Sequence, residues 1–191
     1  MKIVKIVAIA MTSCTLALTM NACKSESKNE KAAPENASND AVIKNGKVQY
    51  SFKADGRKWK VINDDTQEQM KMTQYILEDE QPETVTELFT VTELTDVNIT
   101  PAEYFSQFIT ELQKRYTNAK VESKIISQQT NSLLGEWWIN GTSPDNTQHE
   151  WIRIIKKGND IAILRYSTMH ADKLEQTRKT WESILNDAKL Q

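Results

Sequence analysis

A strongly marked helix start divides the chain into two sets of strand-like segments. Thr100 occupies the N-cap position, Pro101 the first helical position and Glu103 the third, which together form a capping box. Apolar residues then recur at helical spacing, at Tyr104, Phe105, Phe108, Ile109, Leu112 and Tyr116. The pattern predicts a helix over residues 101–116, and Asn118 is a suitable stop.

Segments with alternating or β-branched residues lie on both sides of this helix. Before the helix, we predict strands at 48–52, around Trp59 and Val61, at 70–77 and at 84–94. We expect Asn63-Asp64-Asp65 to interrupt the second of these strands. After the helix, polar connections separate four further predicted strands, at 120–127, 133–140, 149–156 and 161–167. This spacing is typical of an antiparallel meander.

A second amphipathic helix is predicted from about Ala171 onward. One side of it carries Leu174, Arg178, Trp181, Leu185 and Ala188. Several strands between two helices indicate an antiparallel α+β domain, with a sheet and two main helices packed on it. A chain of 191 residues is long enough for one ordinary domain. We place this domain at residues 45–191.

The first 22 residues have the organisation of a signal peptide. Lys2 and Lys5 form a short positive region, and residues 6–20 form an uncharged apolar run. This run is shorter than the roughly 20 residues that a membrane-spanning helix needs. It ends in Met20-Asn21-Ala22-Cys23, which resembles a bacterial lipobox, and Cys14 lies inside the run. The resemblance implies that Cys23 becomes the mature N-terminus and carries lipid; the alternative is an ordinary cysteine near a secreted N-terminus.

The segment that follows is a candidate tether. Residues 24–40 contain no large apolar side chain and are rich in Ser, Asn, Glu, Lys and Ala, so we predict a disordered tether over residues 23–44. Two or more acyl chains on Cys23, palmitate among them, would anchor the domain stably. Lys24 after the cysteine resembles the default outer-membrane signal of Gram-negative lipoproteins. We therefore expect a protein of the cell envelope, held by lipid at the outer membrane and facing the periplasm.

Composition excludes several function classes. Lys and Arg number 24 against 26 Asp and Glu, so no basic excess favours a nucleic-acid partner. The chain has only two Cys and two His, and both Cys lie in the processing region. We expect no metal site and no cofactor, because zinc fingers, iron–sulfur sites and disulfide scaffolds need more of these residues. A Gly-rich phosphate loop does not occur in the sequence.

The layout of the chain resembles that of the DcrB-like bacterial lipoproteins. The shared features are the lipobox, the polar tether, the order of strands and helices, and an opening strand that reads Asn45-Gly46-Lys47-Val48-Gln49-Tyr50-Ser51-Phe52. The resemblance covers residue 45 to the C-terminus and implies a PsbP-like α/β/α sandwich. It also implies a largely non-enzymatic protein that binds other proteins. It carries over no site residue, because it depends on the order of elements.

Both histidines are weak candidates for catalysis. Glu150, the neighbour of His149, lies on the opposite face of the predicted strand. The run His170-Ala171-Asp172 contains the orienting half of a triad, but no serine stands in a nucleophile elbow. Residues 63–68 superficially resemble a calcium loop, although the loop lacks the glycine and glutamate that such a site uses. We expect no catalytic residue, and surface or cap positions for both histidines.

Tryptophans are the better candidates for a functional surface. Trp137 and Trp138 are adjacent, so they point to opposite faces of a strand. We favour core positions for both, as a sandwich with helices on both faces would give; otherwise one of them is exposed. With Trp151, they form a candidate interaction or ligand surface. Trp181 is expected in the core.

The leading hypothesis is a non-catalytic module that binds an envelope protein. One alternative is a binder of a small or apolar ligand in a cleft between sheet and helix, lined by Met70, Met72 and Tyr104. A third hypothesis, a periplasmic hydrolase, needs His149 or His170 within about 3 Å of a serine or an acid.

Overall fold

The computed structural model describes residues 41–139, 148–170 and 173–191. The signal peptide, Cys23 and most of the tether lie outside the described residues, so these calls stay predictions. None of the helices in the described ranges is long and apolar enough to cross a membrane.

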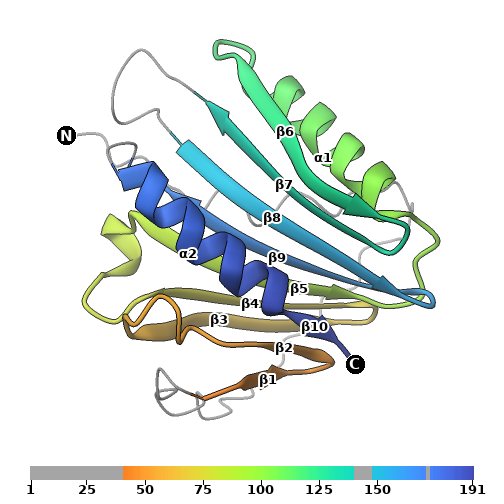
Figure 1. Cartoon of the computed structure of the whole chain (residues 1–191), viewed down its shortest axis with the longest axis horizontal. Coiled ribbons are helices and arrows are strands. Elements are labelled where there is room, and N and C mark those ends of the chain that lie inside the picture. The colour runs from red at the N-terminus through yellow and green to blue at the C-terminus, as the bar shows by residue number, and fades with distance from the viewer. Residues whose placement is uncertain (1–40, 140–147, 171–172) are drawn as a thin grey trace, which may run out of the picture.

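A seven-stranded antiparallel sheet forms the centre of the molecule (Figure 1). Its strands are β3 (Trp59–Gln67), β4 (Met70–Leu77), β5 (Glu87–Leu94), β6 (Val121–Gln129), β7 (Ser132–Ile139), β8 (Gln148–Lys157) and β9 (Asp160–Thr168). They lie in the order β3-β4-β5-β9-β8-β7-β6. Two meanders, β3 to β5 and β6 to β9, are therefore joined through the pairing of β5 with β9.

Two helices and a small sheet cover the large sheet. The helices are α1 (Pro101–Arg115) and α2 (Leu174–Asp187), and the small sheet consists of β1 (Ile43–Asn45), β2 (Val48–Tyr50) and β10 (Lys189–Leu190). α1 packs against β6, β7 and β8, whereas α2 packs against β8 and β2. The two helices lie on opposite faces of the sheet (Figure 1). The α+β class predicted from the sequence is confirmed.

The two faces have different cores. On the α1 face, Phe105, Phe108 and Leu112 pack on aliphatic residues of the sheet: Leu133, Ile139, Ile152, Ile154, Ile161 and Ile163. On the α2 face, the buried side chains are mostly aromatic: Tyr50, Phe52, Trp59, Tyr75, Phe89, Trp151, Tyr166 and Trp181. β9 supplies both cores, because alternate residues point to opposite faces.

Close approach of α1 to the sheet depends on a glycine in β7. A Cβ atom added at Gly135 would lie 2.9 Å from the ring of Phe105. Only glycine leaves room for this aromatic ring against the strand.

Most predicted elements agree with the structure. The capping box at Thr100 and Glu103 forms as predicted, and the helix ends at Arg115. The predicted interruption at Asn63-Asp64-Asp65 is wrong, because β3 continues through these residues after a register shift between Val61 and Asn63. Asp64 accepts a hydrogen bond from the Thr73 hydroxyl, 2.8 Å away on β4. This bond lets an acidic residue occupy the strand.

The other differences are two unpredicted short strands and some element boundaries. β1 begins at Ile43, inside the predicted tether over residues 23–44, because residues 43–45 pair with β2, and β10 follows α2. A short 3-10 helix (Pro82–Thr84) precedes β5, so this strand begins at Glu87 rather than at Thr84. α2 begins at Leu174, and Ala171 lies outside the described residues.

Candidate functional site

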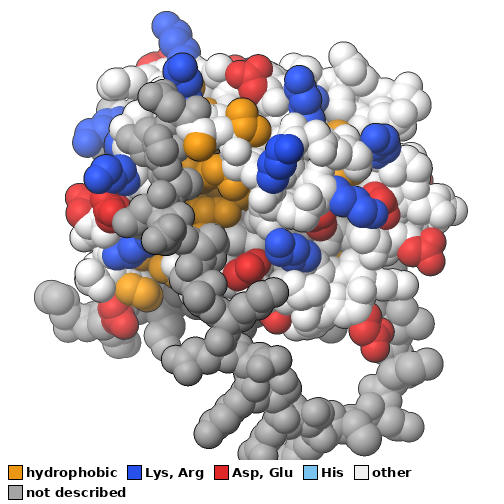
Figure 2. All heavy atoms as spheres, turned by 90° about the horizontal axis from the view of Figure 1, so that it is seen from below, with side chains coloured by type: hydrophobic (Ala, Val, Ile, Leu, Met, Phe, Trp, Pro, Cys, Tyr) orange, Lys and Arg blue, Asp and Glu red, His pale blue; other side chains and the backbone are white. Residues whose placement is uncertain are grey.

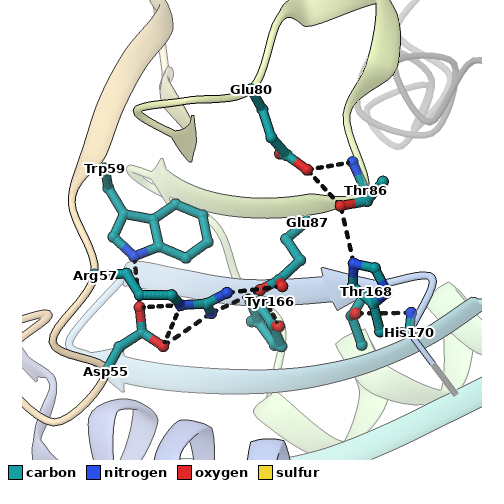
Figure 3. Close-up of polar contacts among 9 residues, drawn as sticks. All are labelled: Asp55, Arg57, Trp59, Glu80, Thr86, Glu87, Tyr166, Thr168 and His170. Atoms are coloured by element: carbon teal, nitrogen blue, oxygen red, sulfur yellow. Dashed lines mark hydrogen bonds and ion pairs between the residues drawn. The ribbon is translucent and has the colours of Figure 1, made fainter. Parts of the chain in front are cut away.

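Three clusters of polar side chains lie inside the described part of the fold. The sheet-end cluster consists of Asp55, Arg57, Trp59, Glu80, Thr86, Glu87, Tyr166, Thr168 and His170 (Figure 3). The α1-side cluster consists of Trp137, Glu150, Arg165 and Ser167. The His149 cluster consists of Glu136, Trp138, His149, Trp151 and Arg178.

Arg57 is the centre of the sheet-end cluster. It follows the turn between β2 and β3 and lies between two carboxylates (Figure 3). Its guanidinium donates to both oxygens of Glu87, at 2.8 and 2.7 Å, and also to Asp55. The Trp59 indole donates to the same Asp55, at 2.9 Å. Each guanidinium nitrogen thus donates to a carboxylate, although 40% of the side chain is exposed.

Glu87 is held ionised in a partly buried place. Burial raises the pKa of this carboxyl, but the hydrogen bonds that Arg57 and Tyr166 donate outweigh burial, so its net pKa lies below the ordinary value. The Tyr166 hydroxyl donates to Glu87 at 2.5 Å. Burial, together with the charge of Glu87, raises the pKa of Tyr166. The tyrosine therefore stays protonated and acts as a donor.

His170 belongs to the second half of the sheet-end cluster (Figure 3). Its Nε2 lies 3.1 Å from the Thr86 hydroxyl, which also contacts Glu80. A carboxylate only accepts hydrogen bonds, so the hydroxyl proton points to Glu80 and His170 donates to Thr86. A nucleophile needs the opposite direction, with its proton given to the base. Thr86 therefore accepts from His170 and donates to Glu80, and its hydroxyl is not arranged as a nucleophile.

His149 is not the surface residue that the sequence suggested. It is buried, and its Nε2 donates to Glu136 at 3.0 Å, while Arg178 donates to the same carboxylate at 2.5 Å. Its ring is stacked between Trp138 and Trp151, with centroid distances of 5.5 and 4.3 Å. Burial lowers the pKa of His149, and Glu136 only partly offsets this effect. The imidazole is therefore neutral at neutral pH.

Two of the three predicted surface tryptophans are in the core. Trp137 and Trp151 are 0% exposed, which corrects the prediction that they contribute to an interaction surface. Helices on both faces of the sheet, together with side chains of the His149 cluster, enclose them. Trp138 is partly exposed and donates from its indole to Glu122 at 2.9 Å. As predicted, Trp137 and Trp138 point to opposite faces of the strand, but only Trp138 stays a surface candidate.

Glu150 occupies the most enclosed polar position described. It is 0% exposed and accepts hydrogen bonds from Arg165 at 2.7 and 2.8 Å. Ser167 and Trp137 also donate to it, at 2.5 and 2.9 Å. The Phe108 ring of α1 lies over the guanidinium of Arg165, 4.8 Å away. This arrangement fits a structural ion pair that α1 seals from water.

Sequence reasoning missed Arg57, Glu87 and Tyr166. Long stretches of chain separate them, and only the pairing of β5 with β9 and the turn before β3 bring them together. No local spacing could have indicated this cluster. Among the described residues, no group of three or more His, Cys, Asp or Glu side chains is placed to hold a metal ion.

A shallow open groove lies beside the start of α1. Its volume is about 430 Å³, and its lining residues are Thr100, Ala102, Gln128, Gln129 and Thr130. The residues predicted to line a ligand cleft, Met70, Met72 and Tyr104, do not line this groove. Its small and polar lining offers little apolar surface to a ligand.

The surface near β1 carries hydrophobic side chains. Figure 2 views the molecule from the side on which β1, β2 and β3 lie in Figure 1, and shows a strip of hydrophobic side chains bordered by both basic and acidic side chains. Val42, directly before β1, is 63% exposed. Ile43 and Val61, from β1 and β3, are partly buried. A hydrophobic strip with a charged rim is typical of an interaction surface.

A family model matches residues 47–188, which is more than half of the chain. The chain belongs to this family. Fourteen chains of solved structures match it as well, and one is the solution structure of the cyanobacterial PsbP (CyanoP) from Synechocystis sp. PCC 6803. That match has a TM-score of 0.51 and 11% identity, and covers 78% of this chain and 95% of the other. At this identity the likeness shows the fold alone, which is PsbP-like. No curated protein matches the chain.

Proposed function

We propose that this protein is a lipid-anchored lipoprotein of the bacterial cell envelope, of the DcrB-like kind, whose domain binds another protein and does not catalyse a reaction. The leader that ends in Cys23 and the polar segment behind it support the anchor. The PsbP-like fold agrees with the family resemblance seen in the sequence. The outer membrane, with the domain facing the periplasm, is the location that Lys24 favours.

The exposed hydrophobic strip near β1 is the observation that carries the binding role. It lies where the described chain begins, and Val42 is the more exposed of the two large hydrophobic residues found exposed in the described ranges. A partner that covers exposed apolar side chains removes them from water, and this lowers the free energy of the complex. Basic and acidic side chains both border the strip, which favours a partner whose rim carries charges of both signs (Figure 2).

The closed polar clusters support a non-catalytic role. Catalysis needs an acid, base or nucleophile that can reach a substrate. Arg57 is paired with two carboxylates, Glu150 is enclosed beneath α1, and the His149 ring is stacked against two indoles. Each of these groups stabilises the fold through its contacts and presents no free reactive atom.

Membrane fractionation of a Cys23→Ala variant tests the anchor. The variant should leave the membrane fraction and incorporate no labelled palmitate, whereas Cys14→Ala should behave like the parent chain. A Cys23→Ala protein that stays lipidated and membrane-bound would overturn the anchor proposal.

Site-specific photo-crosslinking in cells tests the binding role. A photoreactive residue at Val42 should form a discrete adduct with one envelope protein. The same residue at Ser106, on the exposed side of α1, is the control and should give none. Absence of an adduct at Val42, in protein that is folded and lipidated, would count against this surface as the binding site.

A hydrolase assay tests the non-catalytic role. We expect the purified full-length protein to turn over none of a panel of ester and peptide substrates. Turnover that disappears in Thr86→Ala and persists in Thr84→Ala would overturn the proposal, because only the first hydroxyl contacts His170.

A further inference from the structure

β6 is an edge strand of the large sheet. Within the described chain it pairs with β7 alone, so its other side presents backbone N–H and C=O groups without a strand partner (Figure 1). The stretch of β6 with unbroken register runs from Val121 to Ile125, because the register with β7 shifts between Ile125 and Ser127. An edge of five regular residues is long enough to pair with a second short strand.

The side chains of β6 are unusual for a free edge. Ile125 is 45% exposed, and in the described ranges only Val42 is a more exposed large hydrophobic residue. The side chain of Lys124 has no hydrogen bond or ion pair with another described residue. Glu122 lies two positions before it and therefore on the same face of the strand. Such an edge carries, within four positions, an exposed apolar residue, a cation without a side-chain partner in the described ranges, and a carboxylate that Lys120 and the Trp138 indole contact.

We propose that β6 pairs antiparallel with β6 of a second copy of this chain, about a two-fold axis at Ser123. In this register Glu122 of each copy lies opposite Lys124 of the other, which creates two opposite-charge pairs on one face of the joined sheet. On the other face, Val121 lies opposite Ile125 twice. The pairing is isologous, so the same residues serve both copies.

The position of α1 leaves room for this pairing. α1 contacts β6, β7 and β8, so its axis lies near the middle of these strands. Two α1 helices would then be separated by about three strand spacings, roughly 14 Å. Packed helices lie about 8–10 Å apart, so the two helices do not obstruct the pairing. α2 packs on β8 and β2, farther from the joined edges.

The other edge of the sheet is less suited to a second copy. β3 carries Asp64 and Asp65, so two β3 edges would place acidic residues close together. Pairing of β6 with β3 would be heterologous and would leave free edges at both ends. Self-pairing of β6 is the arrangement that closes and also matches opposite charges. It does not depend on the lipid anchor, since β6 belongs to the folded domain.

A disulfide trap on the two-fold axis tests the proposal. The chain has only Cys14 and Cys23, and both lie before the domain. The full-length parent expressed in cells therefore measures how much disulfide-linked dimer these native cysteines form. Residues directly opposite in a strand pair have Cβ atoms about 5 Å apart, so Ser123→Cys should give roughly tenfold more disulfide-linked dimer than the parent under mild oxidation. Gln128→Cys, exposed on the same strand but off the axis, is the matched control and should give little dimer.

Charge reversal tests the register. Lys124→Glu in the Ser123→Cys chain places like charges opposite each other twice, so the dimer should decrease several-fold. Adding Glu122→Lys reverses both members of each pair and should restore it. Near-ultraviolet circular dichroism confirms that each variant is folded, which matters because Glu122 also holds Trp138.

Three outcomes would overturn the proposal. One is a folded Ser123→Cys chain that forms no more dimer than the parent. Another is equal crosslinking at Ser123 and Gln128, which would mean collision without register. The last is a Ser123→Cys chain linked to a different envelope protein in place of itself. A failed anchor test at Cys23 would leave this result unaffected, since purified full-length protein can be oxidised in the same way.

Discussion

The α1-side cluster and the sheet-end cluster use the same chemistry at different depths. Each has an arginine with two hydrogen bonds to one glutamate, and each adds a hydroxyl donor to that glutamate. The side chain of Arg165 is 10% exposed, whereas that of Arg57 is 40% exposed. The comparison therefore sets a buried ion pair beside a more exposed one whose arginine has a second carboxylate, Asp55.

Burial makes it costly to remove one partner of an ion pair, but it adds little to the net stabilisation that the intact pair gives the fold. Two charges taken out of water lose hydration, and their attraction in the interior roughly offsets this loss. When one partner is removed, the other is left buried and unpaired beneath α1. At the sheet end, water and Asp55 can still solvate Arg57. The two clusters should thus differ most when the glutamate is neutralised.

The largest effect is expected for Glu150→Gln. Arg165 would keep its charge with no carboxylate near it, which should lower the free energy of unfolding by about 3–5 kcal/mol. Urea unfolding followed by tryptophan fluorescence measures this change. Adding Arg165→Met should recover part of the loss, because the unpaired charge is removed. A loss under about 1 kcal/mol would contradict the picture of a sealed ion pair.

Glu87→Gln should have a smaller effect of the same sign. Arg57 keeps Asp55 and gains water, so we expect the free energy of unfolding to fall by about 1–3 kcal/mol. The same urea titration checks it, with Glu83→Gln in the short helix before β5 as an exposed control. If Glu87→Gln were as damaging as Glu150→Gln, exposure would not explain the difference between the clusters.

Local sequence signals predicted the elements that frame these clusters. α1 follows from a capping box and apolar spacing within one segment, and the alternation in β7 placed Trp137 and Trp138 on opposite faces. The continuation of β3 through Asn63-Asp64-Asp65 was missed. Its stability depends on a partner strand, since Thr73 donates to Asp64 and Asn63 donates to Gln74. Such cross-strand bonds do not appear in a single segment.

The clusters themselves could not be predicted from spacing. Glu87 and Tyr166 are brought together by the pairing of β5 with β9, which joins the two meanders. Trp151 was a surface candidate because an exposed aromatic suits an interface. The structure buries it beside His149 and Tyr166 on a face that α2 and the small sheet cover. Which face a helix covers depends on tertiary packing.

Acid should reduce the difference between wild type and Glu87→Gln. The pKa of Glu87 is lowered in the folded state, so its contribution is present above the ordinary pKa of 4.5 and is lost as pH falls through the folded pKa. The gap in unfolding free energy between the two proteins should be constant near neutral pH and close below about pH 4.5. Urea titrations at several pH values measure it. A gap that persists in strong acid would mean that Glu87 acts without its charge.

The smallest effect is expected at the His149 cluster, where an arginine and a carboxylate adjoin a titratable ring. Burial lowers the pKa of His149, so the folded state prefers the neutral ring. This contribution is complete above the ordinary pKa of 6.5 and declines as pH falls below it, until the folded pKa is reached. Glu136 pulls the pKa of His149 up, while nearby Arg178 pushes it down.

A His149→Gln variant should therefore unfold with a weaker dependence on pH below about 6.5 than the parent chain. His170→Gln is the matched control, because the chain has two histidines and the second lies in the sheet-end cluster. Urea unfolding at half-unit pH steps, read by tryptophan fluorescence, separates the two. If His170→Gln flattened the profile and His149→Gln did not, the sheet end rather than the stacked ring would be the site where acid weakens the fold.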